Sequence, residues 1–526
     1  KPEDIERLFY PVIDVKVDKK TLSNLIFGTG INAVPGAAVG KIVFSAADAE
    51  AWAARGEKVV LVRRETSPED VGGMAVAQGI LTATGGKTSH AAVVARGWGK
   101  CCIVGAEKID INLKSKTMTS NGKTAKEGDW VTLDGGEGVV YLGPQPLVTP
   151  SLPKSYDTLM KWVDETRKLR VRTNADTPQD SRKAREMGAE GIGLCRTEHM
   201  FFTDFEFPEK GAERQRAIQE MILADEPEAR VKALDKLLPF QRRDFAGIFK
   251  AMDGLPVTIR LIDPPLHEFV PHERAKQAEL AKELGLDVDK VARRVEQLHE
   301  SNPMLGHRGC RLCITYPEIL EMQVRAIIEA AIEVQRGGVK VIPEIMIPLV
   351  LDRKELSILE QSTRRVADAL IAKAKVKLPY LVGTMIELPR AALLADEIAE
   401  VAEFFSFGTN DLTQTTMGLS RDDAGRFLPD YVDEKKAGVF SADPFQSLDQ
   451  KGVGMLMEWA VEKGRKTRDK LKIGICGEHG GDADSVKFCH QIGMDYVSAS
   501  PFRVPISRLA AAQVVVEEKQ AKQKKK

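Results

Sequence analysis

Residues 381–393, LVGTMIELPRAAL, hold the pattern that decides the fold of most of this chain. The stretch begins as a short apolar run and reaches an acidic residue, Glu387, at the end of that run. A short apolar run of this kind predicts a buried strand. The same order, a strand followed by a longer amphipathic helix, recurs along residues 155–512, and such repetition is typical of a parallel sheet.

Eight candidate strands can be counted in this region. Eight strand–helix units predict an α/β fold with a closed parallel (β/α)8 barrel, the TIM barrel. The region is longer than the ~250 residues of an ordinary barrel, so helical insertions are expected, at about 204–250 and 266–300. The strands are expected at residues 170–175, 191–195, 257–262, 305–310, 342–347, 381–386, 404–407 and 473–476.

The chain before the barrel has a different pattern. Residues 34–143 contain mixed short strands and few long helices, and GDWVTLDGGEGVVYL at 128–142 predicts a hairpin with a turn at Asp134-Gly135. This pattern predicts one compact α/β domain. Residues 1–33 are expected to be a lead-in segment. Prolines among residues 144–154 predict an extended linker, and residues 513–526 are expected to be a charged, solvated tail.

Composition excludes several classes of function. Lys+Arg and Asp+Glu both number 76, so the zero net charge gives no general attraction to nucleic acid or an anionic membrane. No apolar run is long enough for a membrane span. The 7 scattered cysteines argue against a disulfide framework, and the pair Cys310 and Cys313 lacks the second pair of a zinc ribbon. A cytoplasmic protein fits these features best.

The sharpest local motif surrounds His90, in TGGKTSHAAVVARG at residues 84–97. Its two adjacent glycines allow the backbone to approach a ligand closely. Thr88 or Ser89 can cap a helix that begins at His90. A histidine in the first turn lies where free N–H groups and the helix dipole favour an anion. The spacing alone fits either a phosphate-carrying histidine or a capped helix whose histidine faces solvent.

The residues that follow the barrel strands are the candidate site, because chemistry on such barrels takes place at the carboxyl ends of the strands. Three are arginines, which can clamp a phosphate. Two are carboxylates suited to Mg²⁺, and one is a cysteine that can act as a general acid. The alternative is that these residues form ordinary ion pairs. Their shared position at the ends of the barrel strands favours a functional site. The residues are Arg196, Arg260, Arg308, Glu387, Asp411 and Cys476.

Residues 82–105, TATGGKTSHAAVVARGWGKCCIVG, closely resemble the phosphohistidine domain of the pyruvate phosphate dikinase family. Related swivelling domains occur in phosphoenolpyruvate synthase and in enzyme I of the sugar phosphotransferase system, and GWGKCC at 97–102 favours the dikinase. The resemblance implies that His90 carries a phosphoryl group between two distant active sites. Lys87 departs from the methionine expected in most members, and it adds a cation beside the phosphate.

Residues 155–512 resemble the phosphoenolpyruvate-binding barrel of the same family. The matching strings are GLCRTEHMFF, RLIDPPLHEF, LGHRGCRL, VGTMIELPRAAL, SFGTNDLTQ and GICGEHGGD. The resemblance implies that Arg196, Arg260 and Arg308 contact the substrate phosphate.

The same resemblance implies roles for the remaining residues. Glu387 and Asp411 would hold magnesium at the enolate oxygen and carboxylate of the substrate. Cys476 would deliver or remove the proton at the methylene carbon. The residues implied to line the substrate are Gly408, Thr409 and Asn410.

The resemblance therefore implies a phosphotransferase that interconverts phosphoenolpyruvate and pyruvate, with Mg²⁺ as cofactor and a homodimer formed through the barrel. The family's complete enzyme also has an N-terminal nucleotide-binding domain, and no G-x-x-x-x-G-K-[ST] motif occurs here. The chain would be the C-terminal portion of such an enzyme, competent for one half-reaction. The nucleotide-binding domain would then have been removed or be supplied by a separate chain.

Other functions stay open at this point. A phosphoenolpyruvate synthase fragment shares the barrel. Enzyme I would need a helical partner-binding insertion, which the sequence does not show. A non-catalytic phosphoryl-carrier or regulatory module is disfavoured by the arginine, carboxylate and cysteine set. A barrel aldolase or lyase of 2-oxo acids would not need His90.

Overall fold

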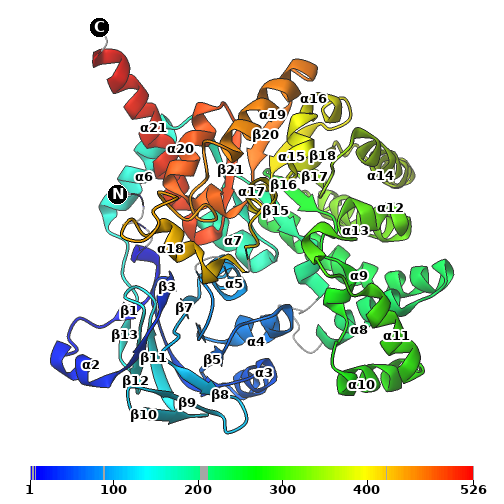
Figure 1. Cartoon of the computed structure of the whole chain (residues 1–526). Coiled ribbons are helices and arrows are strands. Elements are labelled where there is room, and N and C mark those ends of the chain that lie inside the picture. Colours follow the sequence, from blue (N-terminus) through cyan, green and yellow to red (C-terminus); the bar gives the residue numbers. More distant parts are fainter. Residues whose placement is uncertain are drawn as a thin grey trace.

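The computed structural model describes Pro2, Ile5 and residues 7–86, 89–201, 211–421 and 423–524. It contains two bodies (Figure 1): a smaller one built on a mixed sheet, which we call the histidine domain because it carries His90, and a larger barrel domain. The predicted α/β fold class, with a small domain preceding an eight-stranded barrel, is confirmed.

An eight-stranded sheet forms the histidine domain. In sheet order its strands are β2 (Ile26–Thr29), β12 (Val139–Leu142), β11 (Trp130–Asp134), β4 (Ala37–Val43), β5 (Val59–Arg63), β6 (Gly79–Thr82), β7 (Cys101–Val104) and β3 (Ile31–Val34). The strands β4 to β7 are parallel, and the others pair antiparallel. Because β2 lies in the expected lead-in, the sheet begins before residue 34. The hairpin β11–β12 is confirmed, but its turn spans residues 135–138 because Asp134 still pairs with Val139.

Alternate residues of these strands pack on opposite faces of the sheet. Val59 and Leu61 pack on one face with α3 (Ala46–Ala54), α4 (Val71–Val76) and α5 (His90–Gly97). Val60 and Val62 pack on the other face, which is covered by the small sheet of β8 (Asp110–Asn112), β9 (Thr117–Ser120) and β10 (Lys123–Lys126). Alanines of α5 are buried against the first face, so this packing fixes the helix that begins at His90.

A two-stranded ribbon joins the segments that enter and leave the histidine domain. It pairs β1 (Val12–Ile13) with β13 (Leu147–Val148) in antiparallel register. The second of these strands lies within the predicted proline-rich linker. The other short elements of this part of the chain are η1 (Arg7–Phe9), α2 (Lys19–Leu25) and η2 (Pro68–Asp70).

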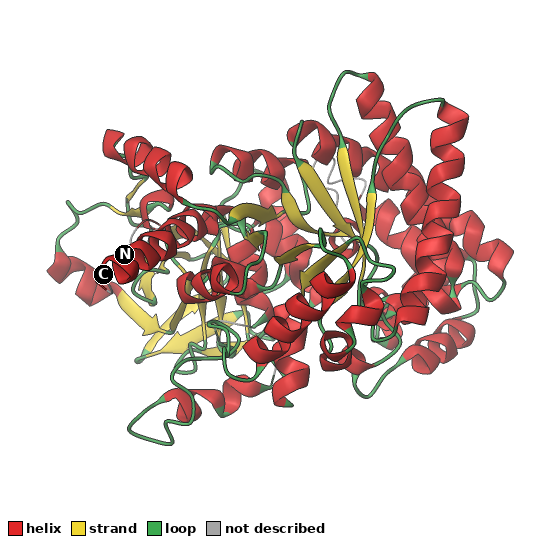
Figure 2. Cartoon of the chain, turned by 90° about the horizontal axis from the view of Figure 1, so that it is seen from above, coloured by secondary structure: helices red, strands yellow, loops and turns green. Residues whose placement is uncertain are grey.

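Eight parallel strands close the barrel, and helices surround them in the view from above (Figure 2). The strands are β14 (Arg170–Asn174), β15 (Ile192–Arg196), β16 (Pro256–Arg260), β17 (Ile342–Ile347), β18 (Leu381–Ile386), β19 (Phe404–Phe407), β20 (Lys472–Ile475) and β21 (Tyr496–Ala499). Seven of the eight predicted strands coincide with these.

One predicted strand, at residues 305–310, is wrong, and the strand β21 was missed. Residue Leu305 ends the short helix η6 (Pro303–Leu305), and α12 (Cys310–Thr315) starts after Gly309. Gly309 has a φ of 57°, a left-handed conformation that interrupts an extended strand. Arg308 therefore lies on a long connection after β16, and Glu387, Asp411 and Cys476 follow the fifth, sixth and seventh strands.

The predicted helical insertions are present after β15 and β16. They contain α8 (Gly211–Leu223) and α9 (Pro227–Ala251), followed by α10 (Arg274–Leu284) and α11 (Val288–Leu298), all green in Figure 1. The charged tail is helical as far as Lys524 in α21 (Val504–Lys524); Val514 and Val515 are buried, whereas residues 517–524 are exposed apart from the half-buried Glu518. Among the described residues, no helix combines the length and apolarity needed to cross a membrane.

The remaining helices of the barrel domain cover its outer surface or extend its loops. They are α6 (Lys154–Thr166), α7 (Pro178–Glu186), η3 (Thr197–Phe201), η5 (Leu266–Phe269), α13 (Pro317–Arg336), α14 (Arg353–Ala374), α15 (Pro389–Leu393), α16 (Ala395–Ile398), α17 (Thr409–Met417), η7 (Ala424–Arg426), α18 (Leu428–Val432), α19 (Val453–Thr467), η8 (Glu478–Gly481), α20 (Ala483–Gln491) and η9 (Pro501–Arg503).

Buried charges connect strands at the amino-terminal end of the barrel. Glu344 is fully buried in β17, and its Oε2 accepts hydrogen bonds from Arg172 Nη1 at 2.8 Å and from Thr258 Oγ1 at 2.8 Å. Lys472 of β20 pairs with the other carboxylate oxygen. Burial opposes ionisation of Glu344, but Arg172 and Lys472 bring its pKa below the ordinary value. This network ties four strands together on the side away from the candidate site.

Candidate active site

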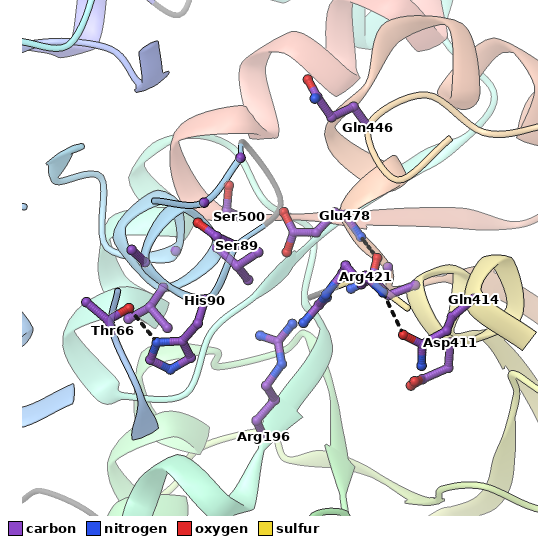
Figure 3. Close-up of a pocket in the computed structure, with 18 of the residues that line it drawn as sticks. Thr66, Ser89, His90, Arg196, Asp411, Gln414, Arg421, Gln446, Glu478 and Ser500 are labelled. Carbon is purple, nitrogen blue, oxygen red and sulfur yellow. Dashed lines mark hydrogen bonds between the residues drawn. The ribbon is translucent and has the colours of Figure 1, made fainter. Parts of the chain in front are cut away.

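A cavity of about 1190 Å³ lies between the histidine domain and the carboxyl ends of the barrel strands. It is lined by His90 and neighbours from one domain and by charged residues of the barrel from the other (Figure 3). The predicted residues that line it are His90, Arg196, Arg260, Arg308, Gly408, Asn410, Asp411 and Cys476. The two other predicted residues, Glu387 and Thr409, are fully buried next to it.

His90 is the first residue of α5, as predicted. Its Nδ1 lies 2.9 Å from Thr66 Oγ1, which holds the ring in the orientation seen in Figure 3. If Nδ1 carries the proton and donates it to Thr66, the lone pair of Nε2 is left for an incoming phosphoryl group. Ser89 occupies the N-cap position without a side-chain capping bond, and Lys87 and Thr88 lie outside the described residues.

The surroundings of His90 disfavour its protonation. Burial, together with His199 and Arg421 of the barrel domain, lowers the pKa of His90 from 6.5 to about 4. An unprotonated imidazole is the nucleophilic form. The guanidinium of Arg421, which disfavours the imidazolium, would also stabilise negative charge on a phosphoryl group between the two domains.

Two arginines share one carboxylate at the base of the cavity. Arg308 Nη2 lies 2.5 Å from Asp263 Oδ2, and Arg260 Nη1 lies 2.9 Å from the same oxygen. Arg260 also pairs with Glu198. Burial alone would favour the neutral forms, but the surrounding carboxylates raise the pKa of both guanidinium groups. The two guanidinium groups are therefore charged and held in place, and the Nε of Arg260 has no hydrogen-bond partner among the described residues.

Arg196 is held by a second carboxylate, Asp176. The backbone N–H of Arg196 donates to Asp176 Oδ1 at 2.6 Å, and its guanidinium lies 3.9 Å from Asp176 Oδ2. His199 Nδ1 lies 2.8 Å from that same oxygen. Since His199 lines the cavity, Asp176 contacts two residues of the cavity wall at once.

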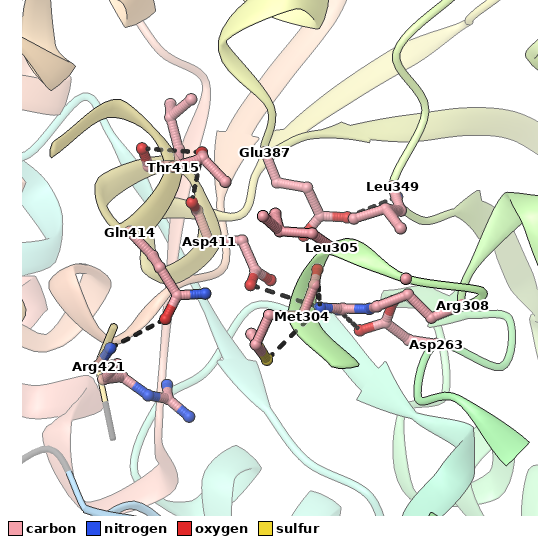
Figure 4. Close-up of polar contacts among 12 residues, drawn as sticks. Asp263, Met304, Leu305, Arg308, Leu349, Glu387, Asp411, Gln414, Thr415 and Arg421 are labelled. Carbon is pink, nitrogen blue, oxygen red and sulfur yellow. Dashed lines mark hydrogen bonds and ion pairs between the residues drawn. The ribbon is translucent and has the colours of Figure 1, made fainter. Parts of the chain in front are cut away.

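Glu387 and Asp411 fit a magnesium ion. Glu387 Oε1 accepts a hydrogen bond from the backbone N–H of Leu349 at 2.6 Å, whereas its buried Oε2 has no partner among the described residues. Burial and the neighbouring carboxylates raise the pKa of Glu387 well above its ordinary value, which is the expected cost of gathering carboxylates without a cation. Figure 4 shows Asp411 directed toward the same region and paired with Arg308 at 3.7 Å.

Gly408 is required beside this pair of carboxylates. A side-chain carbon at Gly408 would lie 2.6 Å from Glu387 Oε2 and 2.5 Å from Met385 Cε. Within the described parts of the chain no cluster of three or more histidine, cysteine or carboxylate side chains fits a metal ion. A magnesium ion bound here would therefore take its other ligands from substrate oxygens and water.

Cys476 follows β20 and is buried at 1% exposure on the wall of the cavity. Burial raises the pKa of its thiol to about 11, although a hydrogen bond with the Ser406 side chain acts in the opposite direction. The thiol is therefore protonated at neutral pH and able to donate a proton. It lies within a small apolar cluster with Leu194 and Met385, which excludes water from that side.

Thr409 and His479 form a buried pair behind the site. His479 Nδ1 lies 2.7 Å from Thr409 Oγ1, and its Nε2 lies 2.8 Å from the carbonyl oxygen of Pro444. With both ring nitrogens engaged and no exposed surface, His479 positions Thr409 and does not reach the cavity. Asn410, one residue on, accepts a hydrogen bond through Oδ1 from the backbone N–H of Glu478 at 3.1 Å.

Several cavity residues have no local signal in the sequence. Arg421 lines the cavity, and its backbone N–H donates to Gln414 Oε1 at 2.9 Å (Figures 3 and 4). It lies in the long connection after α17, at a distance from any strand end. Asp263 follows Arg260 closely and could have been suspected as its partner. Thr66 lies in the loop after β5, 24 residues before His90, and the sequence gives no sign that it contacts His90.

Comparison with known proteins places this geometry in a family. Residues 152–516 match the model described as PEP-utilising enzyme, PEP-binding domain, and residues 55–138 match PEP-utilising enzyme, mobile domain. The chain therefore belongs to the phosphoenolpyruvate-utilising enzymes, as its resemblance implied.

Within this family the chain is similar to proteins named pyruvate, phosphate dikinase. It is 56% identical over 517 residues to pyruvate, phosphate dikinase 1, chloroplastic, of Oryza sativa subsp. japonica, a match that covers 98% of this chain and 53% of the relative. It is 54% identical over 518 residues to pyruvate, phosphate dikinase of Clostridium symbiosum, covering 98% of this chain and 58% of the relative. The chain thus spans little more than half the length of these relatives.

Proposed function

We propose that this protein transfers the phosphoryl group of phosphoenolpyruvate to His90 and releases pyruvate, and that it also catalyses the reverse reaction. This is the phosphoenolpyruvate half of the reaction that the names of its relatives describe. The observation that carries the proposal is that His90 opens on the same cavity as the arginines, the cysteine and one of the carboxylates of the barrel. Mere binding of phosphoenolpyruvate would not require a nucleophilic histidine there.

Arg196, Arg260 and Arg308 are proposed to bind the substrate phosphate. Their pairing with Asp176 and Asp263 keeps them in place before the substrate arrives, so little reorganisation is needed when charge develops. Glu387 and Asp411 are proposed to hold Mg²⁺, which would polarise the enolate oxygen and offset the carboxylate charge of the substrate when bound. Gly408 and Asn410 are proposed to line the substrate, and Thr409, which is fully buried, is proposed to support them from behind.

The proposed transfer step breaks the bond between phosphorus and the bridging oxygen and forms a bond between phosphorus and His90 Nε2. The electron pair of the broken bond stays on the oxygen and gives the enolate of pyruvate. Cys476 then donates its proton to the methylene carbon and leaves a thiolate that must be reprotonated. In the reverse direction Cys476 takes a methyl proton, and the enolate oxygen attacks phospho-His90.

The test is to incubate the protein with phosphoenolpyruvate labelled on phosphorus and with Mg²⁺, without ATP, and to map any acid-labile label. Label on a peptide that contains His90, with pyruvate formed in equal amount, is the expected result. Label that persists in His90→Ala would show that another residue is the acceptor. Wild-type protein that binds phosphoenolpyruvate but is never labelled would exclude the transfer activity.

We further propose that a nucleotide-binding domain outside these 526 residues completes the reaction of the relatives. The proposal is supported by relatives that are nearly twice as long as this chain. The isolated chain should then form no AMP from ATP, phosphate and pyruvate. Steady AMP production by the purified chain would contradict this.

A homodimer formed through the barrel and a cytoplasmic location are also proposed. Met455 and Trp459 lie one helical turn apart on α19 and are 47% and 45% exposed, so they offer an apolar surface to a second copy. Trp459→Asp should therefore shift the sedimentation of the protein toward the monomer.

The cytoplasmic location is supported by the cysteines. All 7 cysteines are buried and free of disulfides, as is typical of a reducing compartment.

A further inference from the structure

The run Gly97-Trp98-Gly99 at the end of α5 has no part in the chemistry described above. Gly99 has a φ of +64°, and a side-chain carbon there would lie 2.0 Å from Phe502 Cε2, 2.3 Å from Cδ2 and 2.6 Å from Cζ. These distances are far too short for any side chain. Gly99 is therefore a socket in the histidine domain that a ring of the barrel domain fills.

Phe502 joins the apolar cores of the two domains. It belongs to η9 of the barrel domain, yet it packs against the buried cluster of the histidine domain as well as against the barrel core. Its ring centroid lies 5.2 Å from that of Tyr10, with the two planes tilted by 31°. Ser500, two residues earlier, lines the cavity that contains His90. The contact is thus directly beside the reaction site.

An ion pair lies near the same end of α5, at Arg96 in its last turn. Arg96 Nη1 is 3.4 Å from Glu478 Oε2, so this pair also connects the two domains. Burial opposes ionisation of Glu478, but Arg96, Arg196 and Arg421 together bring its pKa below the ordinary value. Glu478 follows Cys476 by two residues, whereas Arg96 precedes Gly99 by three. Both contacts are therefore made by the same end of α5 and by loops that border the site.

We propose that Phe502 and the socket at Gly99 form a latch that holds the histidine domain in the position where His90 reaches the barrel site. The inference rests on the proposed function, because only a carrier that must arrive and leave needs a defined but small docking contact. Among the described residues the contacts between the two domains include this aromatic ring and two ion pairs, Arg96–Glu478 and Lys276–Glu69, and interfaces that include polar pairs allow domains to separate again. Phe502 and Arg96 act by positioning His90 and take no part in bond making.

The first experiment measures docking without any reaction. Because all native cysteines are buried, spin labels can be attached selectively to Ser115→Cys in the histidine domain and Gln361→Cys in the barrel domain, both exposed positions. The wild type should give one narrow distance distribution. Phe502→Ala and Gly99→Ala should each broaden it, since the first empties the socket and the second fills it.

The second experiment measures transfer in the same variants. Single-turnover phosphorylation of His90 by phosphoenolpyruvate should slow by on the order of 10- to 100-fold in Phe502→Ala and in Gly99→Ala, as misplacement of a reacting group typically does. Equilibrium binding of phosphoenolpyruvate with Mg²⁺ should stay unchanged. In the double variant Gly99→Ala/Phe502→Ala, the rate should fall by less than the product of the two single fold-losses. The reason is that the methyl group of the new alanine at 99 then lies in the space that the phenylalanine ring has left.

Gly122→Ala is the matched control. Gly122 has a similar φ of +73° and nothing within 4 Å of an added carbon, so this change strains the backbone without touching the barrel. It should leave both docking and transfer unchanged. A narrow distance distribution and normal transfer in Phe502→Ala would overturn the latch. A docked wild type that is never phosphorylated would instead overturn the proposed function and leave the latch standing.

Discussion

His90 Nδ1 and Thr66 Oγ1 lie 2.9 Å apart, although the two residues come from different connections of the histidine-domain sheet. The hydrogen bond ties the tautomer of His90 to the position of one hydroxyl group. A ring that donates from Nδ1 presents its unprotonated Nε2 to the cavity, where the barrel arginines lie.

Thr66→Val should therefore slow the phosphorylation of His90 by phosphoenolpyruvate. One hydrogen bond contributes about 1 kcal/mol, which corresponds to a loss of roughly fivefold in rate. Thr66→Ser keeps the hydroxyl group and should keep most of the rate. Rapid-quench labelling of the two variants checks this, and equal rates for Thr66→Val and the wild type would show that the bond does not orient the ring.

Gly408→Ala should weaken the magnesium site without unfolding the barrel. The added carbon would lie 2.6 Å from Glu387 Oε2, so the Glu387 carboxylate must shift from its present position. Displacement of a ligand or its support typically costs 10- to 100-fold in metal affinity, and we expect the Mg²⁺ concentration for half-maximal labelling to rise by at least about tenfold. The control is Gly418→Ala at the other end of α17, where the φ of +64° makes alanine strain the backbone but the added carbon meets nothing within 4 Å. A normal Mg²⁺ requirement in Gly408→Ala would argue against Glu387 as a ligand.

Much of the barrel could be predicted from the sequence because its strands are apolar and end at charged residues. The failure at residues 305–310 has a local cause. LGHRGC has apolar residues at both ends, but Gly309 adopts a left-handed conformation that no strand contains. The missed strand, Tyr496–Ala499, has only two large apolar residues, Tyr496 and Val497, before the small Ser498 and Ala499, so it lacks a clear apolar run.

The residues predicted for the site line one cavity or lie beside it, but the contacts that position them could not be predicted. Asp263 precedes Arg308 by 45 residues, and Thr409 precedes its partner His479 by 70. Neither separation corresponds to a helical or strand period, so only the closed barrel brings these pairs together. The docking of Gly99 against Phe502 spans two domains and has no local pattern at all.

Glu344→Gln should destabilise the barrel strongly. The substitution leaves Arg172 and Lys472 without their buried counter-charge, and breaking such a pair typically costs about 3–5 kcal/mol. Thermal unfolding followed by circular dichroism at pH 7 measures the loss. Glu462→Gln, which breaks an exposed pair with Lys466, is the control and should change little. Equal midpoints for the two variants would show that the buried network contributes nothing.

The same network predicts how stability depends on pH. The pKa of Glu344 is lower in the folded protein than its ordinary value of 4.5, so its contribution is fully present above about pH 4.5. It is lost as the pH falls through the lowered folded pKa, where Glu344 becomes protonated. The difference in unfolding midpoint between the wild type and Glu344→Gln should therefore narrow as the pH falls below 4.5. A difference that grows on acidification would contradict the assigned sign.

Cys476→Ala should slow proton transfer strongly and leave substrate binding almost unchanged. Burial raises the pKa of the Cys476 thiol to about 11, so the thiol keeps its proton at neutral pH and can donate it. Loss of a general acid typically lowers the rate by about 10²–10⁴-fold. Deuterium exchange into the methyl group of pyruvate should fall by that factor, while phosphoenolpyruvate binds normally through the arginines. Arg260→Ala is the contrasting variant and should lose binding itself. His479 cannot substitute as the donor because both its ring nitrogens are engaged in buried hydrogen bonds. Normal exchange in Cys476→Ala would therefore assign the proton to a bound water molecule.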